Sequence, residues 1–311
     1  MSIHDHPRFA DALALLDAGD AEGLGALLAE DPTLVHARAA SIEEPYEGYF
    51  YGATLLHHVA GNPIRGSLPD NIVEMTTLLL TRGADPEAGC GGGPEQPATD
   101  GGTVMGLVTS GALAHELGHT EGLIDVLLDH GARLDPEGGM FGTLYHTVEH
   151  QGQRDVARML HARGVRADFP IAAGLGRVDL MESFLGTDGA LTDGAAEIWT
   201  RTVRGGSALS SEEIWADALL AASANGWTEA VGWLLERGAP IDAVRKWGPF
   251  PVTALHCAGW AGWPDVVSLL LERGADPAVR EPTYDGTPLV WAAHAKREAA
   301  VKAFVDAGVT E

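Results

Sequence analysis

The chain has few of the residues that build disulfide frameworks or basic surfaces. Its 311 residues include only two cysteines, Cys90 and Cys257, and three lysines. Cysteines so few and so far apart predict neither a disulfide framework nor a cysteine-based zinc site. With 44 acidic and 20 basic side chains the formal charge is −24, which repels phosphate backbones and anionic lipids. We therefore expect no nucleic acid and no membrane as partner. The acidity is explained by the solubility of an exposed surface alone, and the alternative is that it attracts a basic partner.

The sequence also lacks long apolar runs, and its first residues do not resemble a signal peptide. No stretch of about 18 residues is apolar throughout, as a membrane helix requires. The first residues, Met1-Ser2-Ile3-His4-Asp5, have neither the basic nor the apolar region of a signal peptide. We therefore expect a cytoplasmic protein. The preference for arginine over lysine, with abundant alanine and glycine, is typical of a GC-rich bacterial genome.

Motifs that bind nucleotides or supply a nucleophile do not occur. There is no G-x-x-x-x-G-K-[ST] loop and no G-x-S-x-G elbow, and the glycines from Gly89 to Gly93 do not join a predicted strand to a helix. We therefore expect no cofactor. Residue types for a catalytic triad exist, but their spacing does not show that they meet, so we predict no catalytic residue.

One motif with metal chemistry does occur, between His115 and His119. Its sequence, HELGH, matches H-E-x-x-H, which binds zinc when both histidines lie on one unbroken helix. Here Gly118 falls at a turn, and the Leu-rich stretch that follows is typical of a separate helix. The sequence therefore predicts a helix break inside the motif and no metal site.

A complete helix–turn–helix unit lies between Val252 and Asp276, VTALHCAGWAGWPDVVSLLLERGAD. In its Thr-x-x-His tetrad the threonine can cap the first helix, and the histidine can reach back to the hydroxyl. An Ala-rich helix, a glycine turn and a Leu-rich helix follow, and Gly274 can adopt the positive φ that ends the second helix. Three such tetrads are plain, and we predict a structural role for each: Thr54 with His57, Thr143 with His146, and Thr253 with His256.

The closing glycine recurs along the chain, at Gly83, Gly131, Gly164, Gly189, Gly238, Gly274 and Gly308. Successive separations are 48, 33, 25, 49, 36 and 34 residues. A period near 33 with such a tetrad is the signature of the ankyrin repeat. The chain resembles the ankyrin-repeat family over nearly its whole length, and in particular bacterial stand-alone ankyrin-repeat domain proteins. The resemblance implies an all-α solenoid of about seven to eight helix–turn–helix units with hairpin finger loops, each packed mainly on its neighbours.

We expect a single array over residues 1–311. Its parts are an N-terminal capping helical pair at 1–40, a C-terminal capping repeat at 281–311, and repeats at 41–88, 89–136, 137–167, 168–192, 193–243 and 244–280.

Extra residues interrupt the period where the resemblance places finger loops, at 41–52, 89–102, 193–211 and 244–251. Insertions in stacked repeats collect on one face, which is often the binding face. These loops contain many aromatic residues, among them Trp199, and exposed aromatics commonly anchor recognition surfaces. The alternative is that the rings fold inward and seal the loops against the array.

The repeat register also assigns inner-helix positions to a concave groove. Fingers and groove together give the candidate partner-binding residues, which are Tyr49, Tyr51, His58, His150, Trp247, Phe250, Trp260, Trp291 and His294. Each of these histidines alone is more simply a solvated groove residue than a catalytic base.

Because ankyrin-repeat proteins typically act through interaction, the resemblance implies a binding module for a protein or peptide rather than an enzyme. The alternative is a small-molecule-binding protein or enzyme. Its pocket would be formed by inner helices and aromatic finger loops that close over His58, Glu149 and His150. A purely structural array is a third hypothesis.

Overall fold

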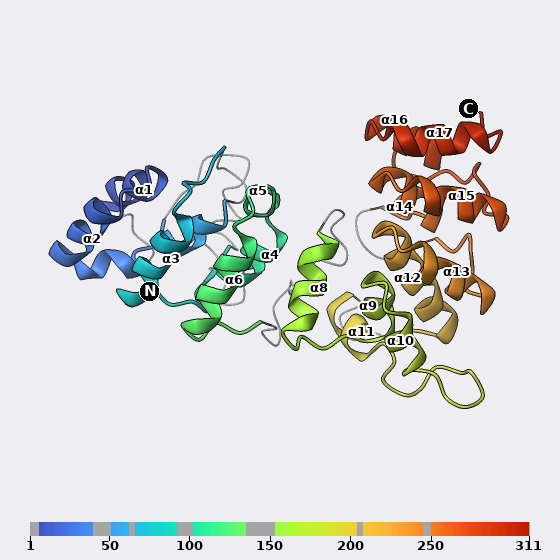
Figure 1. Ribbon diagram of the computed structural model, residues 1–311, viewed down its shortest axis with the longest axis horizontal. Coiled ribbons are helices and arrows are strands. Elements are labelled where there is room, and N and C mark those ends of the chain that lie inside the picture. The colour runs from blue at the N-terminus through green and yellow to red at the C-terminus, as the bar shows by residue number, and fades with distance from the viewer. Residues whose placement is uncertain are drawn as a thin grey trace. The chain divides into compact units, whose positions relative to one another are not determined.

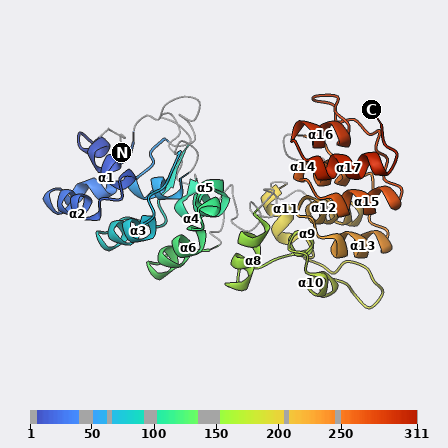
Figure 2. The ribbon, with the colours of Figure 1, turned by 45° about the horizontal axis from the view of Figure 1, so that its top comes forward.

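The computed structural model describes residues 6–39, 51–61, 66–91, 102–134, 153–203, 208–244 and 250–310, and most of them are helical. The chain divides into two compact units, residues 1–143 (unit 1) and 144–311 (unit 2). Paired helices make up both units (Figures 1 and 2). Within the described ranges no helix has both the length and the apolar character needed to cross a membrane.

Unit 1 contains three helical pairs among its described residues. The first joins α1 (Phe9–Asp17) to α2 (Ala21–Glu30), which is followed by the 3-10 turn η1 (Pro32–His36). The second joins the 3-10 helix η2 (Leu55–Ala60) to α3 (Ile72–Thr81), and the third joins α4 (Val104–Ser110) to α6 (Thr120–Asp129), with α5 (Ala112–Glu116) between them. Inner helices α1, η2 and α4 contact in that order, as do outer helices α2, α3 and α6.

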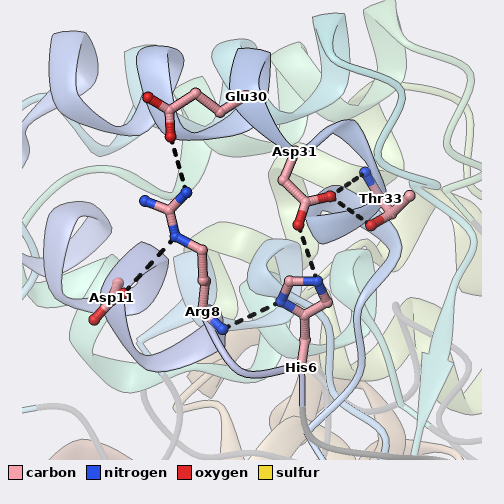
Figure 3. A network of polar contacts seen from close by, with 6 residues as sticks. All are labelled: His6, Arg8, Asp11, Glu30, Asp31 and Thr33. Atoms are coloured by element: carbon pink, nitrogen blue, oxygen red, sulfur yellow. Dashed lines mark hydrogen bonds and ion pairs between the residues drawn. The ribbon is translucent and has the colours of Figure 1, made fainter.

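A polar network ties the start of unit 1 to the end of α2 (Figure 3). His6 Nε2 lies 3.2 Å from a carboxylate oxygen of Asp31, and Arg8 donates to Glu30 at 2.9 Å. Hydrogen bonds from Thr33 hold the pKa of Asp31 below its ordinary value. The network therefore closes the first helical pair with surface contacts, each of which contributes little to stability.

Unit 2 contains a longer stack. Its inner helices α9 (Phe169–Gly174), α12 (Ser211–Ala224), α14 (Ala254–Ala261) and α16 (Pro288–His294) contact one another in sequence. The outer helices α10 (Val178–Glu182), α13 (Thr228–Glu236), α15 (Pro264–Glu272) and α17 (Glu298–Asp306) do the same. In Figure 1 these pairs form successive layers from yellow-green to red. Two further helices, α8 (Arg154–Ala162) and α11 (Glu197–Val203), complete the unit's described elements.

One continuous apolar core runs between the two rows of unit 2, from Phe169 to Phe304. Short helices cannot bury their apolar sides alone, so each pair depends on its neighbours. Close packing is clearest at Gly259, where an added Cβ would lie 2.9 Å from the Pro288 carbonyl oxygen. This glycine lets α14 and α16 approach each other.

The glycine turns follow the sequence prediction. Gly274 has φ +90°, and the other six closing glycines also have positive φ. The helix break inside the HELGH motif is confirmed as well, because α5 ends at Glu116 and α6 begins at Thr120, with Gly118 at φ +76° between them.

Two features differ from a plain helical array. Strands β1 (Gly89–Cys90) and β2 (Gly102–Thr103) pair antiparallel at the base of the second finger, with Gly89 opposite Thr103. In the third finger Trp199 folds inward and is 1% exposed. Its backbone N–H donates to Asp168 and its indole to Asp217, so this ring seals the loop.

Candidate partner-binding surface

The Thr-x-x-His tetrads form buried hydrogen bonds at the starts of two inner helices. Thr253 Oγ1 lies 2.9 Å from His256 Nδ1, and Thr54 Oγ1 lies 2.9 Å from His57 Nδ1. Burial lowers the pKa of both imidazoles, that of His57 to about 3, so both are neutral. The third tetrad, Thr143 with His146, lies outside the described residues.

His256 also fixes the finger that precedes α16. Its Nε2 lies 3.2 Å from the carbonyl oxygen of Gly286 in the next repeat. Gly286 pairs with Glu281, whose buried carboxylate accepts the backbone N–H groups of Thr283 and Tyr284. The tetrad of one repeat therefore holds the loop that presents Tyr284, whose side chain is 72% exposed.

A contiguous series of rings lies on this part of unit 2, and we call it the aromatic row. Phe250 contacts Tyr284 and Trp291 at ring-centroid distances of 5.6 and 5.7 Å. Trp291 contacts Trp260 edge to face at 5.5 Å, and Trp260 stacks on His294 at 6.1 Å. The aromatic row thus consists of Tyr284, Phe250, Trp291, Trp260 and His294.

A small apolar cluster supports the aromatic row. Leu220, Ala224, Val252 and Cys257 are buried together, and Phe250 and Trp291 pack against them. These residues come from α12, α14 and the segment before α14. Rings held by a buried floor and by one another are ordered before any ligand arrives, which lowers the entropic cost of binding.

Formal charge is distributed unevenly between the two units. By sequence, residues 1–143 contain 22 acidic and 5 basic side chains, a charge of −17, whereas residues 144–311 contain 22 and 15, a charge of −7. The described arginines of unit 1 are all engaged within that unit, which leaves its acidic side chains dominant. They are Arg8, Arg38, Arg82 and Arg133.

Four of the predicted binding residues come together in the aromatic row: Phe250, Trp260, Trp291 and His294. In unit 1, Tyr51 is 8% exposed and its carbonyl accepts the Gly91 N–H. His58 packs edge-on against Phe9 at 6.0 Å, and burial lowers its pKa to about 4. Tyr51 and His58 therefore take part in the packing of unit 1 and do not belong to the aromatic row.

Three predicted binding residues, Tyr49, His150 and Trp247, lie outside the described residues, as does Glu149. Tyr284 was not predicted, although its place between the turn at Gly274 and the helix at Pro288 marks a finger. Cys90 is buried, and desolvation raises the pKa of its thiol to about 12, so it is not a ready nucleophile. Across the described part of the chain, no three His, Cys, Asp or Glu side chains converge as metal ligands would.

Comparison with known proteins gives a family match for the end of the chain. Residues 216–310 match the family model for ankyrin repeats in three copies. No curated protein matches. Among solved structures, the ankyrin repeat domain of human ASB11 is 17% identical over 94% of this chain and 96% of that chain, with a TM-score of 0.41. The family match coincides with the regular layers from α12 to α17. Ankyrin repeats in general are protein-interaction modules. Residues 216–310 therefore contain three ankyrin repeats.

Proposed function

We propose that the protein is a binding module that holds a basic protein or peptide partner in the concave groove of its repeats, with the aromatic row as the principal contact. The observation that carries the proposal is the aromatic row itself, which lies within and beside the repeats matched by the family. Aromatic side chains supply large contact areas and are enriched among the residues that dominate binding energy.

The fixed backbone of the loop that carries Tyr284 supports a recognition role. Tyr284 is held through Glu281, Gly286 and His256 rather than by burial of its own ring. A loop whose backbone is fixed while its aromatic ring remains 72% exposed can offer that ring to a partner. Because its backbone is already fixed, this loop loses little backbone freedom on binding.

The basic character of the partner is supported by charge. A protein of formal charge −24 attracts a basic partner over a distance of several ångströms and repels an acidic one. Because screening by salt shortens this range, capture of a basic partner should weaken as ionic strength rises.

The test is affinity capture from native lysate with matched variants. Wild-type protein should retain one defined partner protein, and the double variant Tyr284→Ala/Trp260→Ala should lose it, because the exposed ring of Tyr284 and the half-buried ring of Trp260 are removed. The single variant Tyr284→Ala should retain less of that protein, while the buried cluster beneath the aromatic row stays intact. Val305→Ala is the control, since Val305 is 57% exposed on α17, away from the aromatic row.

Circular dichroism verifies that each variant is folded. Retention of the same protein by the folded double variant would overturn the assignment of the aromatic row. Capture that is indifferent to ionic strength would overturn the basic character of the partner and leave the contact surface in place.

A further inference from the structure

The aromatic row contains hydrogen-bond donors that have no acceptor within the chain. Among the described residues, the indole nitrogens of Trp260 and Trp291 donate to no acceptor, and the Tyr284 hydroxyl has no partner either. Four other described tryptophans donate their indole N–H to an oxygen of the chain, and they are Trp199, Trp227, Trp233 and Trp263. Neither nitrogen of the row is buried without a partner in the described part of the chain, so each is open to an acceptor from outside.

The inner helices that carry the row have no Asp, Glu, Lys or Arg. The sequence of α14 is ALHCAGWA, that of α16 is PLVWAAH, and residues 250–253 are FPVT. In the finger, the buried carboxylate of Glu281 accepts two backbone N–H groups, and that of Asp285 lies 3.3 Å from a nitrogen of Arg280. A cationic side chain on the rings would therefore meet only ring faces and carboxylates that are already engaged.

A ligand for this surface needs acceptors and apolar groups, with few donors of its own. Polar groups that lose water and find no partner weaken a contact. A partner helix uses its carbonyl groups within itself, so it would leave the indole N–H groups unpaired. An extended strand brings one N–H group with nearly every carbonyl, whereas the row itself offers donors. An anion would supply acceptors, but the formal charge of −24 repels it.

A proline-rich segment meets these requirements. Proline has a backbone carbonyl and no backbone N–H. In the polyproline II conformation the carbonyl groups make no hydrogen bonds within the segment and stay available to donors. Such segments dock on aromatic-lined grooves, and because their conformation is already ordered they lose little entropy on binding.

We propose that the segment of the partner that covers the aromatic row is proline-rich and lies there in the polyproline II conformation. Its carbonyl oxygens accept from the indoles of Trp260 and Trp291 and from the hydroxyl of Tyr284, and its pyrrolidine rings pack on the aromatic faces. The basic residues of the partner lie outside this segment, where the negative charge of the chain attracts them without direct contact. This inference rests on the proposed function and names the contact segment of the partner.

The test titrates the full-length protein with a synthetic peptide of about nine prolines, which make three turns of polyproline II, with an arginine pair at each end. The indole N–H resonances of Trp260 and Trp291 should shift, and exchange of these hydrogens with solvent should slow, because they become bonded. The resonances of Trp227 and Trp263, which are already bonded, should stay in place. The same peptide with alanine in place of proline keeps the charge and should bind roughly tenfold more weakly.

Two variants remove donors and keep an aromatic ring at each position. Tyr284→Phe loses only the hydroxyl and should bind the proline peptide roughly fivefold more weakly, and Trp260→Phe/Trp291→Phe should lose roughly tenfold or more. Calorimetry measures the affinities, and circular dichroism verifies the fold. Trp215→Phe is the control, because Trp215 also has an indole without an acceptor among the described residues, but it contacts Phe169 and Trp233 instead of the row. It should bind as the wild type does.

Equal binding of the proline and alanine peptides would overturn the inference, and so would wild-type affinity in both folded donor variants or the absence of any response at millimolar proline peptide. The proposed function survives these results if Tyr284→Ala/Trp260→Ala still releases the partner captured from lysate. Retention of that partner by the folded Tyr284→Ala/Trp260→Ala variant would instead overturn the proposed function, and the present inference with it.

Discussion

The two units fasten successive layers in different ways. In unit 2 the connection between inner and outer helix is short, and in two of the layers it contains a tryptophan that reaches back to the preceding inner helix, as Trp263 does to Ala224. In unit 1 extra residues lengthen that connection, and Asn71 at the start of α3 donates its amide to Gly19 instead, at 2.9 Å. Both side chains satisfy a carbonyl of the preceding turn. The indole adds a large apolar surface, so the same bond comes with more packing in unit 2.

The largest expected effect is the difference in stability loss between substitution of Trp263 and substitution of Asn71. Trp263→Ala should destabilise unit 2 by about 3 kcal/mol, because it removes an aromatic ring together with the bond to Ala224. Asn71→Ala should cost unit 1 about 1 kcal/mol, the value of one hydrogen bond. Urea unfolding followed by hydrogen exchange of peptides from each unit measures both. Equal losses would show that the indole contributes no more than its hydrogen bond.

Much of this architecture could be predicted from sequence. The closing glycines fix turns because glycine adopts positive φ readily. Seven of them mark the layers even where the rest of the repeat departs from the Thr-x-x-His pattern. The break at Gly118 follows from the same physics and separates His115 from His119. The recurrence of Gly226-Trp227 and Gly262-Trp263 can also be read from the sequence, and it marks the two indoles that bond to the preceding inner helices.

Other parts depend on tertiary contacts that no local pattern encodes. The direction of Trp199 is set by two buried carboxylates, one from α12 and one that precedes α9. Nothing in the spacing of Arg154 and Arg158 indicates that their guanidinium groups lie over the indoles of two layers, Trp263 and Trp227. The 3-10 form of η2 likewise differs from the α-helix of α14, although both begin with the same tetrad.

Acid should lower the stability of unit 1 more than that of unit 2. The folded pKa of His57, about 3, lies below the ordinary 6.5, so the unfolded chain binds a proton first as pH falls. Stability is therefore lost below pH 6.5, by about 2 kcal/mol at pH 5 for this residue. His58, with a pKa of about 4, acts in the same direction. Unit 1 should accordingly unfold at lower urea at pH 5 than at pH 7.

Unit 2 contains an opposing group. Burial raises the pKa of Asp168 to about 6, so the folded state binds a proton before the unfolded chain does, and stability rises as pH falls from 6 toward 3.8. The lowered pKa of His256 offsets part of this gain. The same urea experiment should therefore show a smaller loss in unit 2 than in unit 1. Asp168→Asn should increase the loss in unit 2, and an unchanged pH response in that variant would remove Asp168 from the explanation.

Two glycine-to-alanine substitutions should have the smallest effects on stability, and these effects should have opposite signs in the two units. Gly259→Ala should destabilise unit 2 by about 1 to 2 kcal/mol, because the new Cβ meets the Pro288 carbonyl. In α2 of unit 1, Gly25→Ala meets only side-chain atoms at 3.8 Å or more and should stabilise by about 0.5 kcal/mol through helix propensity. Thermal unfolding of the two variants provides the measurement. Stabilisation by Gly259→Ala would show that α14 and α16 are packed less closely than described.

Indole bonds from Trp227 and Trp263 fasten three successive layers of unit 2, whereas the indoles of the aromatic row, Trp260 and Trp291, make no such bond among the described residues. Solvent exchange of the assigned indole N–H hydrogens, measured by nuclear magnetic resonance on the full chain, tests this difference most directly. Trp227 and Trp263, which donate at 2.6 and 2.9 Å, should exchange slowly, and Trp260 and Trp291 should exchange fast. Exchange of Trp227 and Trp263 as fast as that of Trp291 would contradict the account.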